Sequence, residues 1–109
     1  MPTTYKVLGQ AAPTAATATT LYTVPTATST VVSTITVANT SATATSFRIA
    51  IRPAGATLAN LHYVAYDTAL AGNSTIAMTL GITLAATDVV TVYATLATVS
   101  FSAFGSEIS

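Results

Sequence analysis

The sequence predicts an all-β fold, an antiparallel β-sandwich of about eight strands with no significant helix. The first observation is periodicity, because apolar residues alternate with small polar ones in five segments, as in strands buried on one face. The second is spacing, because these segments recur about every 10 to 15 residues between turn-prone stretches. The third is composition: 24 of the 109 residues are Thr, a β-branched residue that suits a half-exposed sheet. A jelly-roll-like and an immunoglobulin-like sandwich both fit these observations.

Eight segments are expected as strands: Tyr5–Leu8, Leu21–Val24, Val31–Asn39, Phe47–Arg52, Leu61–Tyr66, Thr75–Ile82, Val89–Ala94 and Thr98–Phe104. In Val31–Asn39, for example, one face is expected to carry Val31, Ser33, Ile35 and Val37, and the other Val32, Thr34, Thr36 and Ala38. Residues 10–20 are almost entirely Ala and Thr, and interleaved Thr disfavours the helix that Ala alone would favour. The expected organisation is therefore an extended N-terminal strand or arm over residues 1–20 and one sandwich domain over residues 21–109.

Turns are expected where Pro, Gly, Asn and Ser interrupt the alternation. Asn tolerates a positive φ and Gly prefers it, and Pro53 cannot donate to a strand ladder, so it ends the segment before it. The expected turns are Pro25–Ser29, Asn39–Thr45, Pro53–Thr57, Gly72–Ser74 and Ala85–Asp88.

Composition and charge exclude several classes of function. Charged residues are 6% of the chain, against about 25% in an ordinary globular protein, and three basic residues balance three acidic ones. Binding to nucleic acid through clustered basic charge is thereby excluded. The absence of Cys excludes disulfides, thiol chemistry and cysteine-ligated metals. We expect no membrane partner, since no apolar run is long enough to span a bilayer. A surface with few charges and no net charge favours association, which suits a subunit of an assembly.

Groups for catalysis or metal binding are scarce. The one histidine is His62 and the carboxylates are Asp67, Asp88 and Glu107. A triad of His62, Asp67 and a serine is conceivable, but nothing marks a nucleophile elbow. We expect His62 to be structural or to lie in an interface, and Asp67 and Asp88 to form turns. No enzyme activity, catalytic residue, metal site or cofactor is predicted.

Two basic residues and two tyrosines are candidates for an interface. Arg48 and Arg52 lie four residues apart on one expected strand, and so on the same face. That face is either solvated, with Asp67 or Asp88 as partners, or a contact surface for another subunit. Tyr63 and Tyr66 are expected on opposite faces, one in the core and one on the surface. The interface residues predicted are Arg48, Arg52, His62 and Tyr66.

The order of several segments resembles small virion structural proteins of tailed bacteriophages, especially those of marine and cyanobacterial hosts. The segments are YKVLGQ (5–10), LYTVP (21–25), TVVSTITVAN (30–39), FRIAIRP (47–53), HYVAYD (62–67), LGITLAATDVVTVY (80–93) and FSAFGSE (101–107). The resemblance covers nearly the whole chain and consists of strand and turn patterns. It implies a place in the virion, assembled in the bacterial host cytoplasm, and it transfers no catalytic residue.

Three functional hypotheses follow. The first is a protein that decorates or cements the capsid through homo-oligomeric sandwich contacts as a trimer, with the major capsid protein or tail proteins as further partners. In that hypothesis the arm, residues 1–20, reaches a neighbouring subunit. The second is an accessory subunit of the neck, tail or baseplate. The third, from another class, is a carbohydrate-binding adhesive module at a fibre tip, using Tyr63, Tyr66 or His62.

Overall fold

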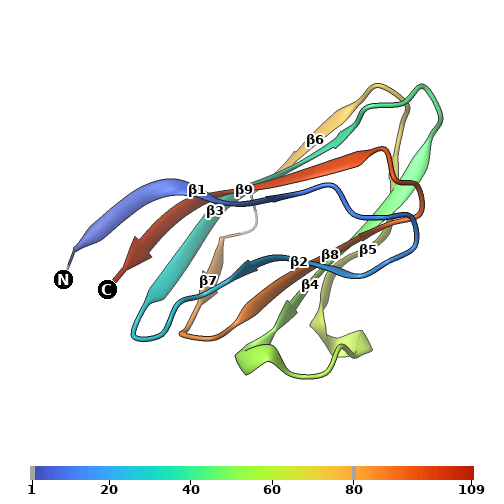
Figure 1. Ribbon diagram of the computed structural model, residues 1–109. Helices are drawn as coiled ribbons and strands as arrows, with labels where there is room; N and C mark the ends of the chain where they lie inside the picture. Colours follow the sequence, from blue (N-terminus) through green and yellow to red (C-terminus); the bar gives the residue numbers. More distant parts are fainter. Residues whose placement is uncertain (1, 80) are drawn as a thin grey trace.

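The computed structural model describes residues 2–79 and 81–109 as two antiparallel sheets packed face to face (Figure 1). The strands of the first sheet, sheet A, are in spatial order β1 (Thr3–Ala11), β9 (Val99–Ile108), β3 (Ser29–Asn39) and β6 (Thr75–Met78), with β7 (Ile82–Leu84) also pairing with β3. The strands of sheet B are β2 (Thr19–Thr23), β8 (Val89–Ala94), β4 (Thr45–Arg52) and β5 (Tyr63–Leu70). Within the described residues the helical segments are two short 3₁₀ turns, η1 (Pro53–Gly55) and η2 (Asn60–His62). The predicted all-β sandwich is confirmed.

The connections between strands identify the sandwich as a jelly roll. Strands β6 and β7 pair in turn with β3, so they act as one interrupted strand. Counted so, the chain changes sheet at each connection except β4 to β5. This is the order of two intertwined Greek keys. An immunoglobulin fold begins with two neighbouring strands in one sheet, whereas β1 and β2 lie in different sheets. Of the two architectures left open by the sequence, the jelly-roll-like one is correct.

The expected strands are all present, but only Val89–Ala94 has the expected bounds, and three of the other seven show the main differences. The segment Thr75–Ile82 is broken between β6 and β7, where Gly81 has a φ of +64° that ordinary strands do not adopt. Leu80, expected inside that strand, lies outside the described residues. The segment Leu61–Tyr66 begins with the last two residues of η2, and only then enters β5. Strand β9 continues to Ile108, four residues beyond the expected end.

The N-terminal residues expected to form an arm are part of the sandwich in this structure. Strand β1 pairs with β9 from Thr3 to Ala11, with one bulge at Leu8. It also passes so close to β2 that a Cβ at Gly9 would lie 2.1 Å from the Leu21 carbonyl oxygen. The expected domain boundary at residue 20 falls inside β2. Residues 2–20 therefore form one side of the molecule and not a separate extension.

The core lies between the inner faces of the two sheets. Phe47 of β4 and Phe101 of β9 meet edge to face with ring centroids 6.1 Å apart, so the aromatic pair joins sheet B to sheet A. Around them lie aliphatic side chains with essentially no exposed surface: Ile35, Val37, Ile49, Leu70, Val90, Val92 and Val99. Burial of each such side chain contributes about 1.5–3 kcal/mol, which makes this layer the main stabilising element.

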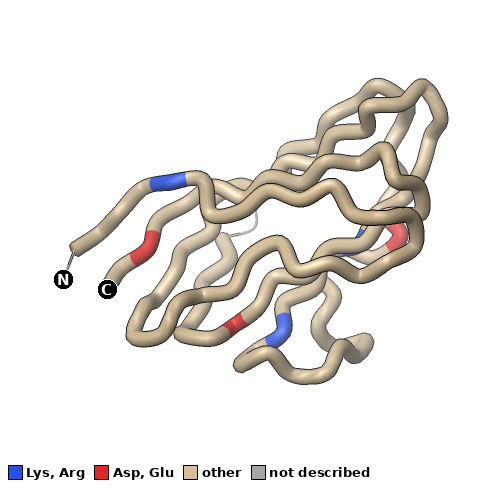
Figure 2. Tube along the Cα trace, in the orientation of Figure 1, with Lys and Arg blue, Asp and Glu red and all other residues tan. Residues whose placement is uncertain are grey.

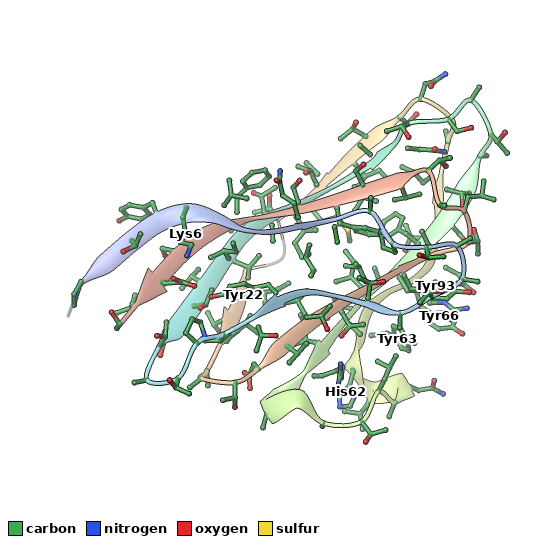
Figure 3. The ribbon with its side chains drawn as sticks, in the orientation of Figure 1. Lys6, Tyr22, His62, Tyr63, Tyr66 and Tyr93 are labelled. Carbon is green, nitrogen blue, oxygen red and sulfur yellow. The ribbon has the colours of Figure 1, made fainter. Side chains whose placement is uncertain are left out.

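A buried polar network anchors the C-terminal end of β9. The Tyr22 hydroxyl donates to Glu107 Oε2, and the same hydroxyl lies 2.9 Å from Thr30 Oγ1. Lys6 Nζ donates to Glu107 Oε1 at 3.2 Å. The hydrogen bond from Tyr22 lowers the pKa of Glu107, while burial and the Glu107 carboxylate raise the pKa of Tyr22 to about 12. Figure 3 labels Lys6 and Tyr22 at this end of the sandwich.

Candidate functional site

Three tyrosines, Tyr63, Tyr66 and Tyr93, lie near one another on sheet B (Figure 3), and Arg48 contacts two of them on its outer face. Arg48 on β4 stands opposite Tyr93 on β8 in the strand register. Its guanidinium carbon lies 4.2 Å from the ring centroid of Tyr66 and 4.4 Å from that of Tyr93. Both distances are well within the range of a cation–π contact. One side chain from the centre of the sheet thus fixes two aromatic rings.

Asp67 completes the set by binding the same guanidinium from the side. Arg48 Nε donates to Asp67 Oδ1 at 2.6 Å and a terminal nitrogen donates to Oδ2 at 3.3 Å, which is a bidentate pair. These hydrogen bonds raise the pKa of Arg48 further above its ordinary value. Asp67 has a φ of +46° at a bulge where the pairing of β4 with β5 loses register. A bulge re-aims side chains, and here it turns the carboxylate toward Arg48.

A shallow pocket, called here the tyrosine pocket, lies beside this cluster. Its lining residues are Asn60 from η2 with Tyr63 and Tyr66 from β5, and its volume is about 430 Å³. The two rings meet edge to face, with centroids 4.8 Å apart and planes at 79°. The prediction that Tyr63 and Tyr66 face opposite ways is wrong, because the register shifts in β5 bring both side chains to one surface.

Of the four predicted interface residues, the structure brings Arg48 and Tyr66 together. Arg52 lies on the same face of β4 but turns toward its own loop. Its guanidinium donates to the carbonyl oxygens of Ala56 at 2.7 Å and Gly55 at 3.1 Å, and to Thr91 Oγ1 at 3.2 Å. These donors hold the loop that contains η1, so the role visible for Arg52 is structural.

His62 lies inside the protein and not at a surface. Its side chain is 7% exposed, and its Nδ1 accepts a hydrogen bond from the Ala59 N–H at 3.0 Å. The His62 N–H in turn donates to the Ala59 carbonyl oxygen at 3.0 Å. The expectation that His62 contributes to an interface is corrected on this ground: the imidazole closes the η2 turn that carries Asn60.

The three carboxylates of the chain each stabilise local structure. Asp88 accepts from the Ala54 N–H and the Ala85 N–H, both at 2.9 Å, and so forms the turn that the sequence predicts. Asp67 lies within β5 and pairs with Arg48, so its expected turn-forming role is wrong. Glu107 belongs to the Tyr22 network. Over residues 2–79 and 81–109, no three His, Cys, Asp or Glu side chains come together as a metal site would require, and no helix is long and apolar enough to cross a membrane.

Comparison of the chain with protein-family models, with curated proteins and with solved structures finds no match in any of the three. The resemblance to phage virion proteins therefore stays a prediction.

Two residues of the candidate site were not predicted as functional. Tyr93 alternates with Val90 and Val92, so its outward direction follows from the sequence, but its position opposite Arg48 depends on the register of β8. The sequence does not indicate a role for Asn60, because its position beside the pocket depends on the η2 turn, which the sequence did not predict.

Proposed function

We propose that this protein is a virion structural protein of a tailed bacteriophage, which decorates or cements the capsid through contacts between copies of the sandwich. The observation that carries the proposal is an apolar patch on the outer face of sheet A, called here the β1 patch. Tyr5 is 84% exposed, Val7 49% and Val31 37%, and Phe104 is partly exposed beside them. A soluble monomer rarely leaves such a contiguous group uncovered.

The strand register makes these side chains one surface. Tyr5 of β1 and Val31 of β3 both stand opposite Ser106 of β9, so the three form a row across the sheet. Two residues further along, Val7 stands opposite Phe104. Residues that face one another on neighbouring strands share a face. The β1 patch therefore lies on one face, with Tyr5, Val7 and Phe104 on two neighbouring strands and Val31 on the third, beyond Ser106.

The patch borders a free sheet edge. Strand β1 is the last strand of sheet A, so one side of its backbone is open to another strand. Its one charged residue, Lys6, is held by Glu107 inside the same molecule. An edge without a free charge is suited to pairing with a neighbouring subunit. Figure 2 shows how few charged positions the chain has elsewhere to oppose such contacts.

The fold is consistent with this role. Jelly rolls form viral capsid domains as well as lectin domains, although fold alone does not decide function. The chain's only histidine and its three carboxylates are engaged in turns, an ion pair and a buried network. In a structural role these contacts fix the turns and hold neighbouring strands together.

The test is to find the chain in purified particles. Mass spectrometry of gradient-purified virions, followed by location of its density by electron microscopy, is expected to place it on the head. A copy number equal to that of the capsid lattice supports decoration, while one equal to a single ring supports the neck, tail or baseplate instead. Absence from the particle would contradict both.

A further inference from the structure

We propose that the tyrosine pocket, formed by Asn60, Tyr63 and Tyr66, binds a neutral saccharide. The proposal goes beyond a structural role in the virion and does not depend on it. The pocket belongs to sheet B, whereas the β1 patch belongs to sheet A, so binding of a ligand and contact between copies use different faces of the sandwich.

The size and shape of the pocket suit one or two sugar rings. Its volume of about 430 Å³ lies in the lower part of the usual range for small-molecule sites, about 300–1,000 Å³. Tyr66 is 54% exposed there although it belongs to an ordered cluster. An exposed, fixed aromatic ring presents a flat face, and the C–H face of a pyranose is flat and apolar in the same way. One face of the Tyr66 ring is covered by Arg48, so contact with a sugar would use the remaining exposed surface of the two tyrosine rings.

The aromatic surface is also preorganised. Tyr66 is held by Arg48 at 4.2 Å and by the edge of the ring pair with Tyr63. Arg48 is itself fixed by Asp67 and by Tyr93. Ordering side chains on binding costs free energy and weakens the affinity for a small ligand. Because the side chains of this site are already fixed, that cost is small. This matters for a shallow site, where each contact contributes little.

The electrostatics favour a neutral ligand. All three lining residues are uncharged at neutral pH. The Arg48 guanidinium lies against the Tyr66 and Tyr93 rings and forms a bidentate pair with Asp67. The charges of Arg48 and Asp67 therefore balance each other within the cluster. A phosphate, sulfate or acidic sugar would find no free cation in the pocket lining. Hydroxyl groups, in contrast, need only neutral donors and acceptors.

Polar groups at the rim distinguish a sugar from an apolar side chain. The Asn60 amide offers both donors and an acceptor, and the two tyrosines add hydroxyl groups. Neighbouring hydroxyls of a sugar match such an amide, which can donate to one and accept from the other. An apolar side chain docked in the pocket would cover the amide without satisfying its hydrogen bonds, which is unfavourable. The chemistry thus selects a saccharide over a hydrophobic peptide segment.

The experiment is a glycan array with the full chain, followed by titration of the best neutral oligosaccharide by isothermal calorimetry. Tyr66→Ala and Asn60→Ala are expected to weaken binding at least about tenfold each, the second without touching the Arg48 cluster. The matched control is Tyr5→Ala, which removes an even more exposed tyrosine from the other sheet. Circular dichroism verifies that each variant is folded.

Two results would overturn the proposal. One is the lack of any neutral saccharide bound at millimolar concentration by the folded wild-type chain. The other is binding that survives both Tyr66→Ala and Asn60→Ala. If the two variants lose attachment to particles while no glycan binds, the pocket is a protein contact and the saccharide proposal fails, although the virion proposal stands.

Discussion

A single hydroxyl group, that of Tyr22, links the pH dependence of folding to the end of β9. It donates to Glu107, and this bond lowers the pKa of the carboxyl group in the folded state. A carboxylate with a lowered folded pKa stabilises the native state above its unfolded pKa of about 4.3. That stability is lost as the pH falls through the lower, folded value. Acid should therefore loosen the junction of β9 with β1, β2 and β3.

The variant Tyr22→Phe tests this junction. Removing the hydroxyl leaves Glu107 with Lys6 as its remaining side-chain partner, so we expect the free energy of unfolding at neutral pH to fall by about 1–3 kcal/mol. The loss of stability between about pH 5 and pH 3 should also become smaller than in the wild type. Urea unfolding measured across that range gives both quantities, with Tyr5→Phe as the exposed control. An unchanged acid dependence would show that the Tyr22 bond does not lower the pKa of Glu107.

At the scale of single residues, the sequence predicts which face of a strand a side chain occupies, but not which side chains of other strands lie close to it. Alternation correctly placed Arg48 and Arg52 on one face of β4, because the period of a strand is two. It failed for Tyr63 and Tyr66, and also for Val31, which lies on the outer face and not with Ile35. In both strands a bulge inserts an extra residue and reverses the faces that follow. The proximity of Tyr66 and Tyr93 to Arg48 depends on three strands pairing in register, which a single sequence does not encode locally.

The strands themselves were predicted where packing and local pattern agree. Strand β8 has the expected bounds, Val89–Ala94: the expected turn Ala85–Asp88 precedes it, and the residues after Ala94 leave the strand in a turn that the sequence did not indicate. Strands β6 and β7 were expected as one, since alternation continues through the break at Gly81. The choice of a jelly roll over an immunoglobulin-like order lies in the connections between sheets. Periodicity describes each strand but not which strand lies beside it.

The approach of β1 to β2 leads to a prediction for the whole element. A methyl group at Gly9 would meet the Leu21 carbonyl at 2.1 Å, so Gly9→Ala must push the two strands apart. We expect it to lower the free energy of unfolding by about 1–3 kcal/mol, although Ala at an unstrained site stabilises slightly. Chemical denaturation measures the effect, and Gln10→Ala at the neighbouring exposed position should change little. Equal stabilities of the two variants would show that β1 is free to move away from β2.

At the scale of the whole molecule, the two outer faces of the sandwich have different characters. Sheet A presents the β1 patch, and sheet B presents the tyrosine pocket. The chain measures 45 × 27 × 20 Å, and its termini lie together at one end, where the Ser109 N–H donates to the Pro2 carbonyl oxygen (Figure 1). A subunit attached through sheet A would leave sheet B facing outward. Decoration of a particle and binding of a saccharide are therefore compatible in one chain.

The assembly proposed for sheet A makes a direct prediction about mass in solution. The untagged wild-type chain should sediment as more than one copy of 11.0 kDa, because the β1 patch is covered when copies meet. An isologous contact would give a dimer, and a heterologous one a closed ring such as the expected trimer. Tyr5→Glu replaces the most exposed residue of the patch with a charged one and should shift the equilibrium at least about tenfold toward the single chain. Leu61→Glu, at an equally exposed apolar position of the η2 turn, should leave the mass unchanged. A wild-type chain that stays single at high concentration, or a Tyr5→Glu chain that keeps the wild-type mass, would contradict self-association through this face.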